Sequence, residues 1–183
     1  MKIARYLLCS ISIFIFLIGC NNNSGNDSRS KGVISLESSA FGENENIPSN
    51  FTCDGMDISP PLLWSNLPNG TKSIAIITDD PDAPVGTWVH WIIYNMPTTS
   101  NKLDENVTRD RQLENGALQG RNDFGKIGYN GPCPPQGTHR YYYKIYALDS
   151  MLNLVPGVNK EKLENAMKGH ILAKGQLVGK YGR

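Results

Sequence analysis

The feature that most constrains the fold is a corner of acids and prolines that follows a short apolar run. Residues 73–77 (SIAII) are apolar and rich in β-branched side chains, which predicts a buried strand. Residues 78–84 (TDDPDAP) then place three aspartates and two prolines at its end. Because proline lacks an N–H and fixes φ, we expect the strand to stop there. Burying carboxylates at the end of a buried strand costs free energy unless they have hydrogen-bond or charge partners. This corner is therefore a candidate functional site.

Two of the three histidines lie where they could partner these acids. His90 lies near the start of one apolar segment (WVHWIIYNM), and His139 lies just before another (YYYKIYAL). Both segments predict strands, because they are rich in aromatic and β-branched residues. We therefore expect the two imidazoles to meet Asp80 and Asp82.

The strand that carries His90 is predicted to be central in its sheet. Strict alternation places His90 on the same face as Ile92 and Tyr94, and Val89 on the face of Trp91. Both faces are apolar, which is typical of a strand covered on both sides.

Composition and periodicity favour a single mainly β domain. The chain has 183 residues and a formal charge of +1, which suits one globular domain and argues against nucleic acid as the main partner. Several strands and long loops are accompanied by one amphipathic helix, predicted over residues 160–174 with Asn159 as its N-cap and Gly175 as its end. His170, in the last predicted helical turn, is interpreted as structural. We expect a mainly β, sandwich-like domain rather than an α/β one.

The first residues of the chain predict export and anchoring. Lys2 and Arg5 precede an apolar run over residues 7–18, which is shorter than the roughly 20 residues that span a bilayer and is typical of a signal peptide. The run closes on LIGC, which resembles the lipobox of bacterial lipoproteins and implies that residues 1–19 are removed and that Cys20 is lipidated. An ordinary secretory signal with an incidental cysteine is the alternative.

Residues 20–31 predict a flexible tether between the lipid and a folded domain of residues 32–183. The segment NNNSGNDSRSK has no large apolar side chain, so it cannot offset the entropy of ordering. Asn21 after Cys20 resembles lipoproteins that diderm bacteria send to the outer membrane. We expect a lipid-anchored protein of the bacterial cell envelope, which faces the periplasm if the cell is diderm.

Cysteine usage leaves two thiols in the folded domain. Cys9 leaves with the signal peptide and Cys20 carries lipid, so Cys53 and Cys133 remain. In an oxidising compartment these two invite a disulfide. The alternative is a pair of free buried cysteines, because the sequence does not place their Cα atoms close together.

The residue types around the corner suit an anion site. Imidazoles, the hydroxyl of Tyr141 and backbone N–H groups near Gly131 are donors, and Asp80 and Asp82 would accept from the imidazoles and favour their charged form. A phosphate oxygen would then accept charge-assisted hydrogen bonds. The chain has no HExxH or CxxC spacing for zinc and no GxSxG elbow for hydrolysis, so we expect no metal, no cofactor and no catalysis. The structural alternative is that strand-end histidines satisfy buried backbone groups.

Four ordered motifs resemble one known family. DPDAP at residues 80–84, HW at 90–91, GPCPP at 131–135 and HRY at 139–141 are similar to motifs of the phosphatidylethanolamine-binding protein (PEBP) family, also called Raf kinase inhibitor proteins. The TCDG…SPPLLW segment and the GHILAKG…GKYGR ending resemble its bacterial branch, and the resemblance covers residues 34–183. It implies a PEBP-like fold, in which a large antiparallel sheet packs on a smaller sheet with one or two short helices.

The same resemblance implies a small pocket that binds phosphate, phosphorylated groups or related anions. Carried over position by position, the pocket residues are Asp80, Asp82, His90, Gly131, Pro134, His139 and Tyr141. The C-terminal helix that borders the pocket in eukaryotic members is not recognisable in this chain, which implies a more open pocket.

The leading interpretation is an envelope lipoprotein that binds phosphate, a phosphoryl head group or a similar small anion, as a binding or regulatory module and not as an enzyme. Binding should tighten at lower pH, because a protonated imidazole donates from both nitrogens. The alternative is a protein-interaction module, such as a protease inhibitor, that meets a protein partner through exposed loops such as residues 97–120.

Overall fold

The computed structural model describes residues 32–183. Three predictions therefore lie outside the described residues: the signal peptide of residues 1–19, the lipidation of Cys20 and the tether of residues 20–31. Within the described part of the chain, no helix has the length and apolar character needed to cross a membrane.

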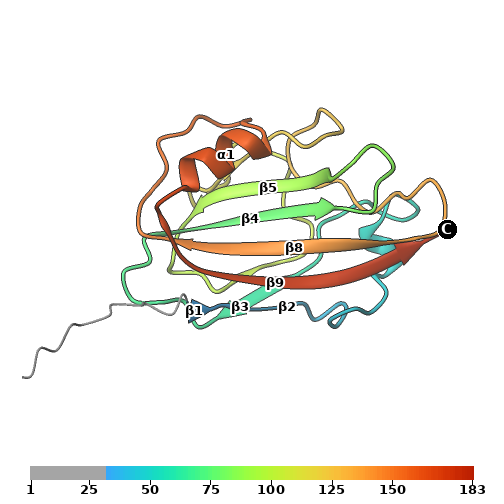
Figure 1. The fold of residues 1–183 in the computed structure, drawn as a ribbon, viewed down its shortest axis with the longest axis horizontal. Helices are drawn as coiled ribbons and strands as arrows, with labels where there is room; N and C mark the ends of the chain where they lie inside the picture. The colour runs from blue at the N-terminus through green and yellow to red at the C-terminus, as the bar shows by residue number, and fades with distance from the viewer. Residues whose placement is uncertain (1–31) are drawn as a thin grey trace, which may run out of the picture.

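The described chain is mainly β and forms two sheets (Figure 1). The larger sheet has the order β1-β9-β8-β4-β5-β7, and the smaller has the order β2-β3-β6. The strands are β1 (Gly32–Val33), β2 (Ser35–Glu37), β3 (Leu62–Ser65), β4 (Ser73–Asp80), β5 (Trp88–Met96), β6 (Lys102–Leu103), β7 (Leu118–Gln119), β8 (Thr138–Leu148) and β9 (Ile171–Gly182). A 3-10 helix, η1 (Ser49–Phe51), and one α-helix, α1 (Lys160–Met167), complete the described elements. The predicted fold class is confirmed, with the difference that β1 pairs in parallel with β9, so the large sheet is mixed.

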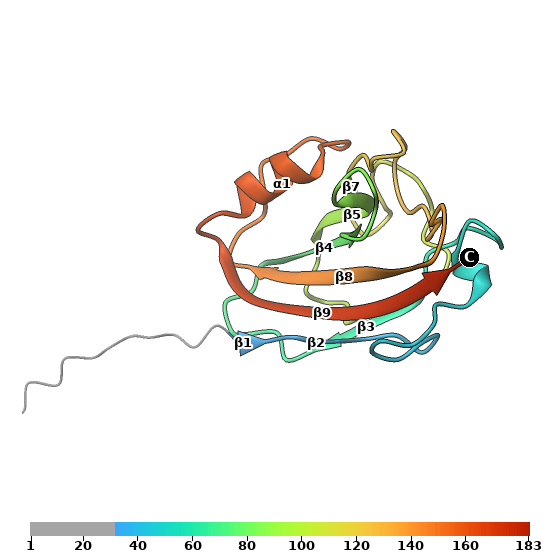
Figure 2. The same cartoon turned by 45° about the vertical axis from the view of Figure 1, so that its right-hand side comes forward.

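The main core lies between the two sheets (Figure 2). Trp64 of β3 belongs to the same buried cluster as Trp91 of β5 and Tyr143 of β8. On the other face of the large sheet, α1 and the segment before it cover β4 and β5 with side chains that include Leu152 and Leu163. Both central strands are therefore buried on both faces, as their continuous apolar pattern predicted.

The predicted helix over residues 160–174 is wrong at its C-terminal end. The side chain of Asn159 caps the first turn as expected, but α1 ends at Met167. Gly169 adopts a φ of 83° and turns the chain, and β9 begins at Ile171. Because β9 pairs with β8 along its length, ladder hydrogen bonds outweigh the helical spacing of the apolar residues.

Gly175, predicted to end the helix, instead lies inside β9. A Cβ at this position would overlap the backbone oxygen of Ile34, so glycine lets the start of the domain pack against this strand. His170 lies in the exposed turn before β9, with its Nδ1 2.8 Å from Oδ1 of Asp149.

A β-bulge turns His90 away from the face that strict alternation predicted. Thr78 of β4 pairs with Trp91, and the next pair is Asp79 with Val89, so His90 is an extra residue in β5. Beyond the bulge the ring of His90 packs edge-on against a tyrosine of β8, on the side of the sheet that faces the small sheet. The predicted facing of His90 is therefore wrong, because the bulge interrupts the period of two.

β4 continues through Asp80, three residues beyond its predicted end, and Pro81 follows it. Since side chains alternate along a strand, Asp79 and Asp80 point to opposite sides of the sheet. The carboxylate of Asp79 is fully buried and accepts from Nζ of Lys144 at 2.7 Å and from Nζ of Lys160 at 2.6 Å. Asp80 is left to face the side on which the pocket histidines lie.

Candidate functional site

Asp80, His90 and His139 line one pocket of about 280 Å³. They come from the last residue of β4, the bulge of β5 and the second residue of β8, and β4 lies between the other two strands. In Figure 1 this is the end of the sheet at which the arrowheads of β4 and β9 lie. Pro134 lies in the same wall. The structure thus brings four of the predicted site residues together.

His139 and Asp80 form a buried hydrogen-bonded pair. Nδ1 of His139 lies 2.7 Å from Oδ2 of Asp80, and the two side chains are 10% and 4% exposed. The second oxygen of Asp80, Oδ1, accepts from the backbone N–H of Asp82 at 2.8 Å. Both carboxylate oxygens are therefore engaged, and Nε2 is the ring nitrogen that His139 has left for a ligand.

His90 is held by the backbone and not by a carboxylate. Its Nδ1 lies 2.7 Å from the backbone oxygen of Asn130, and the residue is 2% exposed. Burial lowers the pKa of His90, and the Asn130 carbonyl and the charge of Asp80 oppose that shift. The ring packs edge-on between Phe124 and Tyr141, with centroid distances of 5.3 and 5.2 Å.

Asp82 pairs with Arg140 rather than with an imidazole, so that part of the prediction is wrong. Its carboxylate accepts from Nε of Arg140 at 2.8 Å, from Nη2 at 2.6 Å and from the backbone N–H of Arg140 at 3.0 Å. These hydrogen bonds and the guanidinium charge lower the pKa of Asp82 to about 2. A bidentate arginine is a stronger partner than a neutral ring, and here it ties the turn after β4 to β8.

The backbone N–H of Gly131 is not available to an anion, contrary to the sequence-based expectation. It donates to Oδ1 of Asp57 at 2.6 Å, and the same carboxylate accepts from Asn130 and from Arg109. A Cβ on Gly131 would overlap the backbone at Phe51. The glycine therefore serves close packing behind the pocket wall.

Tyr141 packs against the rings of His90 and His139. Its ring stacks beside His139 with centroids 6.5 Å apart, and its side chain is fully buried. Burial, with the nearby charge of Asp80, raises the pKa of the hydroxyl. The hydroxyl has no hydrogen-bond partner among the described residues. Tyr141 thus packs against both histidine rings, and the backbone N–H of Cys133 opposes the rise in the pKa of its hydroxyl.

Cys53 and Cys133 form a disulfide with their Cα atoms 5.4 Å apart. Cys133 lines the pocket with Pro134 and Pro135, and the backbone N–H of Cys53 donates to the oxygen of Pro132 at 3.0 Å. The bond therefore fastens the proline-rich wall to the segment that contains η1.

The sequence-based reasoning missed an apolar rim around the pocket. Trp88 and Phe124 pack edge to face across it, with centroids 5.5 Å apart, and Pro84 and Val85 extend it along the turn after β4. Val85 is 77% exposed and Phe124 is 37% exposed. Large apolar side chains in loops rich in glycine and proline were a signal that could have identified this rim.

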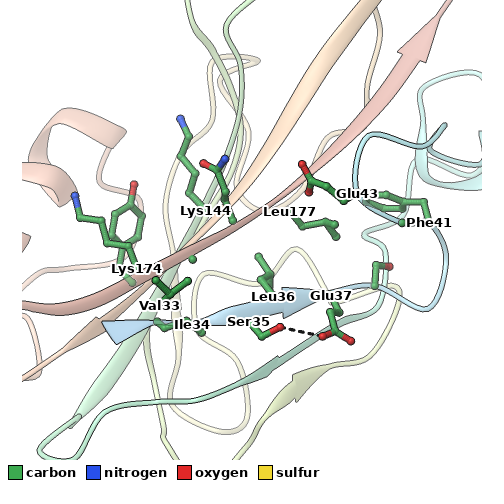
Figure 3. A pocket seen from close by; sticks show the side chains of 15 residues that line it. Val33, Ile34, Ser35, Leu36, Glu37, Phe41, Glu43, Lys144, Lys174 and Leu177 are labelled. Carbon is green, nitrogen blue, oxygen red and sulfur yellow. Dashed lines mark hydrogen bonds between the residues drawn. The ribbon is translucent and has the colours of Figure 1, made fainter. Parts of the chain in front are cut away.

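A larger hollow lies elsewhere in the described part of the chain. It is a groove of about 800 Å³ between β2 and the edge of β9, with Leu36, Phe41 and Leu177 among its walls and Lys174 at its rim (Figure 3). Lys144 also borders it, but its ammonium group is bound to a buried aspartate of β4. The groove is lined by no histidine and by none of the predicted site residues.

The smaller pocket contains groups that can form hydrogen bonds with a ligand. Two histidines and a buried aspartate line it inside mainly apolar walls, and because Nδ1 of each ring is already hydrogen-bonded, Nε2 is the ring atom left for a ligand. Among the described residues, no three His, Cys, Asp or Glu side chains gather as a metal site would require. Such a site can bind a small polar group whose oxygens meet the two rings.

Comparisons with known proteins agree on one family. The family model described as phosphatidylethanolamine-binding protein matches residues 37–182. A UPF0098 protein of Methanothermobacter thermautotrophicus is 50% identical over 150 residues, which cover 82% of this chain and 99% of the relative. A UPF0098 protein of Aquifex aeolicus is 44% identical over 154 residues, which cover 82% and 90%.

Two crystal structures are also similar. A PEBP homolog from Chlamydia trachomatis has a TM-score of 0.76 and 43% identity, and the match covers 82% of this chain and 98% of that one. An E. coli protein described as a new member of the mammalian PEBP family has a TM-score of 0.77 and 32% identity, with 83% and 99% covered.

Proposed function

Because this chain belongs to the phosphatidylethanolamine-binding protein family, we propose that it is a binding protein that holds a phosphoryl group or a similar small oxyanion between Asp80, His90 and His139. The observation that carries the proposal is the convergence of both buried imidazoles on one pocket, each with Nδ1 already fixed by the protein. Fixed rings lose little entropy when they bind, so their Nε2 atoms are prepared for a ligand.

The size of the pocket supports a small ligand. Its volume of about 280 Å³ lies at the lower limit of the roughly 300–1,000 Å³ that enclose drug-sized molecules. Hydrogen bonds to charged groups contribute about 1.5–3 kcal/mol each, so two or three of them suit a ligand of weak to moderate affinity. A head group fits these limits, and a complete diacyl lipid does not.

The proposal includes a lipid anchor in the bacterial cell envelope, which is supported by the lipobox-like LIGC at residues 17–20. Gly32, where the described chain begins, pairs with Ala173 of β9, whereas His139 pairs with Tyr181. These positions are eight residues apart on β9, or about 26 Å at 3.3 Å per residue. An anchored chain would therefore hold its pocket at the end of the sheet remote from its attachment.

We assign the chain a role as a binding or regulatory module and not as an enzyme. This assignment is supported by relatives named for binding and by a site whose polar groups are two imidazoles and one engaged carboxylate. The alternative role, protease inhibition through residues 97–120, would need a loop that projects to a protein partner. Most of that segment is exposed, and Gln119 fastens part of it by donating to the oxygens of Thr108 and Asp110.

Replacement of His139 by alanine is expected to weaken phosphate binding at least about tenfold, because one charge-assisted hydrogen bond and its orienting pair are lost. Isothermal titration of the purified protein with inorganic phosphate measures the change. His170→Ala is the matched control, since His170 also pairs with an aspartate but is exposed and lies at the other end of β9. Equal phosphate affinity in His139→Ala and in the unmodified protein would contradict the proposal.

A further inference from the structure

The two pocket histidines are fixed in the same tautomer. Nδ1 of His90 lies 2.7 Å from the backbone oxygen of Asn130, and a carbonyl oxygen can only accept, so this nitrogen carries a hydrogen. Nδ1 of His139 lies 2.7 Å from Oδ2 of Asp80, and an ionised carboxylate also only accepts. In a neutral ring, Nε2 is therefore a bare lone pair that accepts hydrogen bonds and does not donate them.

The surroundings of His90 keep its ring neutral. The residue is 2% exposed, and burial lowers its pKa despite the opposing effects of the Asn130 and Gly131 backbone carbonyls and of the charges of Asp80 and Asp79. The rings of Phe124 and Tyr141 pack against it. At neutral pH the ligand therefore meets a hydrogen-bond acceptor at Nε2 of His90.

We infer that the pocket selects small phosphomonoesters, whose phosphoryl group still carries a P–OH, over phosphodiesters. The inference rests on the proposed function and narrows its ligand class. The free oxygens of a diester only accept, so one of them would face the lone pair of His90 without a hydrogen between them. The second pKa of a phosphomonoester is about 6, so near neutrality part of it can donate P–OH to Nε2. The other free oxygens of the phosphoryl group remain for the ring of His139, which lines the same pocket.

One proton is shared between the ligand and His90 in this arrangement. It arrives as the P–OH of the monoanion, or from solvent when the dianion binds. Affinity for a monoester should therefore fall as the pH rises above about 6, approaching tenfold per pH unit.

The walls of the pocket indicate what the monoester carries. Trp88 and Phe124 pack edge to face, and Pro84 and Pro135 lie beside them. Aromatic and proline faces favour a flat apolar substituent on the phosphoryl group. Phenyl phosphate is therefore the appropriate probe.

The test compares three compounds by titration calorimetry near pH 6 with the purified protein. These are phenyl phosphate, its methyl diester, and 4-methylphenyl phosphate, which adds the same methyl group to the ring and controls for bulk. We expect the two monoesters to bind at least about tenfold tighter than the diester. Equal binding of phenyl phosphate and its diester overturns the inference but leaves the proposed function standing. If neither they nor inorganic phosphate bind, the proposed function fails and the inference falls with it.

The variant His90→Asn isolates the role of Nε2. Its amide N–H₂ can retain the hydrogen bond to the Asn130 oxygen, but it has no atom at the position of Nε2. We expect the preference for the monoester to be lost in this variant, and an unchanged preference would overturn the inference.

Ring ¹⁵N spectra of the unmodified protein test the same point without a substitution. We expect a protonated Nδ1 and a bare Nε2 for His90 at neutral pH, and a hydrogen on Nε2 would overturn the inference.

Discussion

Replacement of both Cys53 and Cys133 by serine is expected to lower the free energy of unfolding by about 4 kcal/mol. The disulfide spans a sequence separation of 80 residues, and closing a loop of that length restricts the unfolded chain by about 4–5 kcal/mol in the chain-entropy model. The folded state should change little, because serine is close to cysteine in size and the backbone hydrogen bond between Cys53 and Pro132 remains. Urea unfolding followed by tryptophan fluorescence measures the difference.

The unmodified protein under a reducing agent is the matched control for the double variant. It should lose the same stability, since both treatments open the same loop. Phosphate binding should weaken as well, because Cys133 lines the pocket next to Pro134. A loss of less than about 1 kcal/mol in both cases would show that the loop is already restricted in the unfolded chain.

Gly131→Ala is expected to lower the free energy of unfolding by about 3 kcal/mol or more, which is at the upper end for overpacking. The new Cβ would overlap the backbone oxygen of Phe51 and lie 2.7 Å from Cα of Thr52. Backbone atoms cannot swing aside as a long side chain can, and the disulfide at Cys53 holds this segment in place. Relief of this overlap would move Gly131 away from Asp57 and break a partly buried hydrogen bond.

Gly32→Ala is the matched control for Gly131→Ala. Its new Cβ would lie 3.8 Å from Cβ of Ala173, which is an ordinary contact, so we expect a change below about 1 kcal/mol. Equal denaturation midpoints for the two variants would show that the wall behind the pocket adapts, which would contradict the packing role given to Gly131.

The architecture could be predicted because its signals are local. Apolar β-branched runs marked β4 and β5, and aromatic residues marked β8, so the mainly β class followed from periodicity. The C-terminal end of α1 could not be predicted in this way. The apolar residue Ile171 fits a helical spacing as well as a strand, and the pairing of β9 with β8, which decides between them, joins distant parts of the chain.

The site was predictable in its residue types and less so in its contacts. Asp80, His90 and His139 do meet in one pocket, as the motifs implied. The hydrogen-bond partners of the predicted site residues could not be predicted from the alternation of side chains along a strand. The bulge at His90 interrupts that alternation, and Arg140 takes the place of an imidazole as the partner of Asp82. The backbone N–H of Gly131 is likewise occupied, because it donates to the carboxylate of Asp57, which lies 74 residues earlier in the chain.

A crystal structure of the protein grown in phosphate tests the central claim most directly. The proposed function predicts one phosphate in the pocket, with two of its oxygens within about 3 Å of Nε2 of His90 and Nε2 of His139. Ordered phosphate bound instead in the groove between β2 and β9, or elsewhere with the histidine pocket empty, would contradict it.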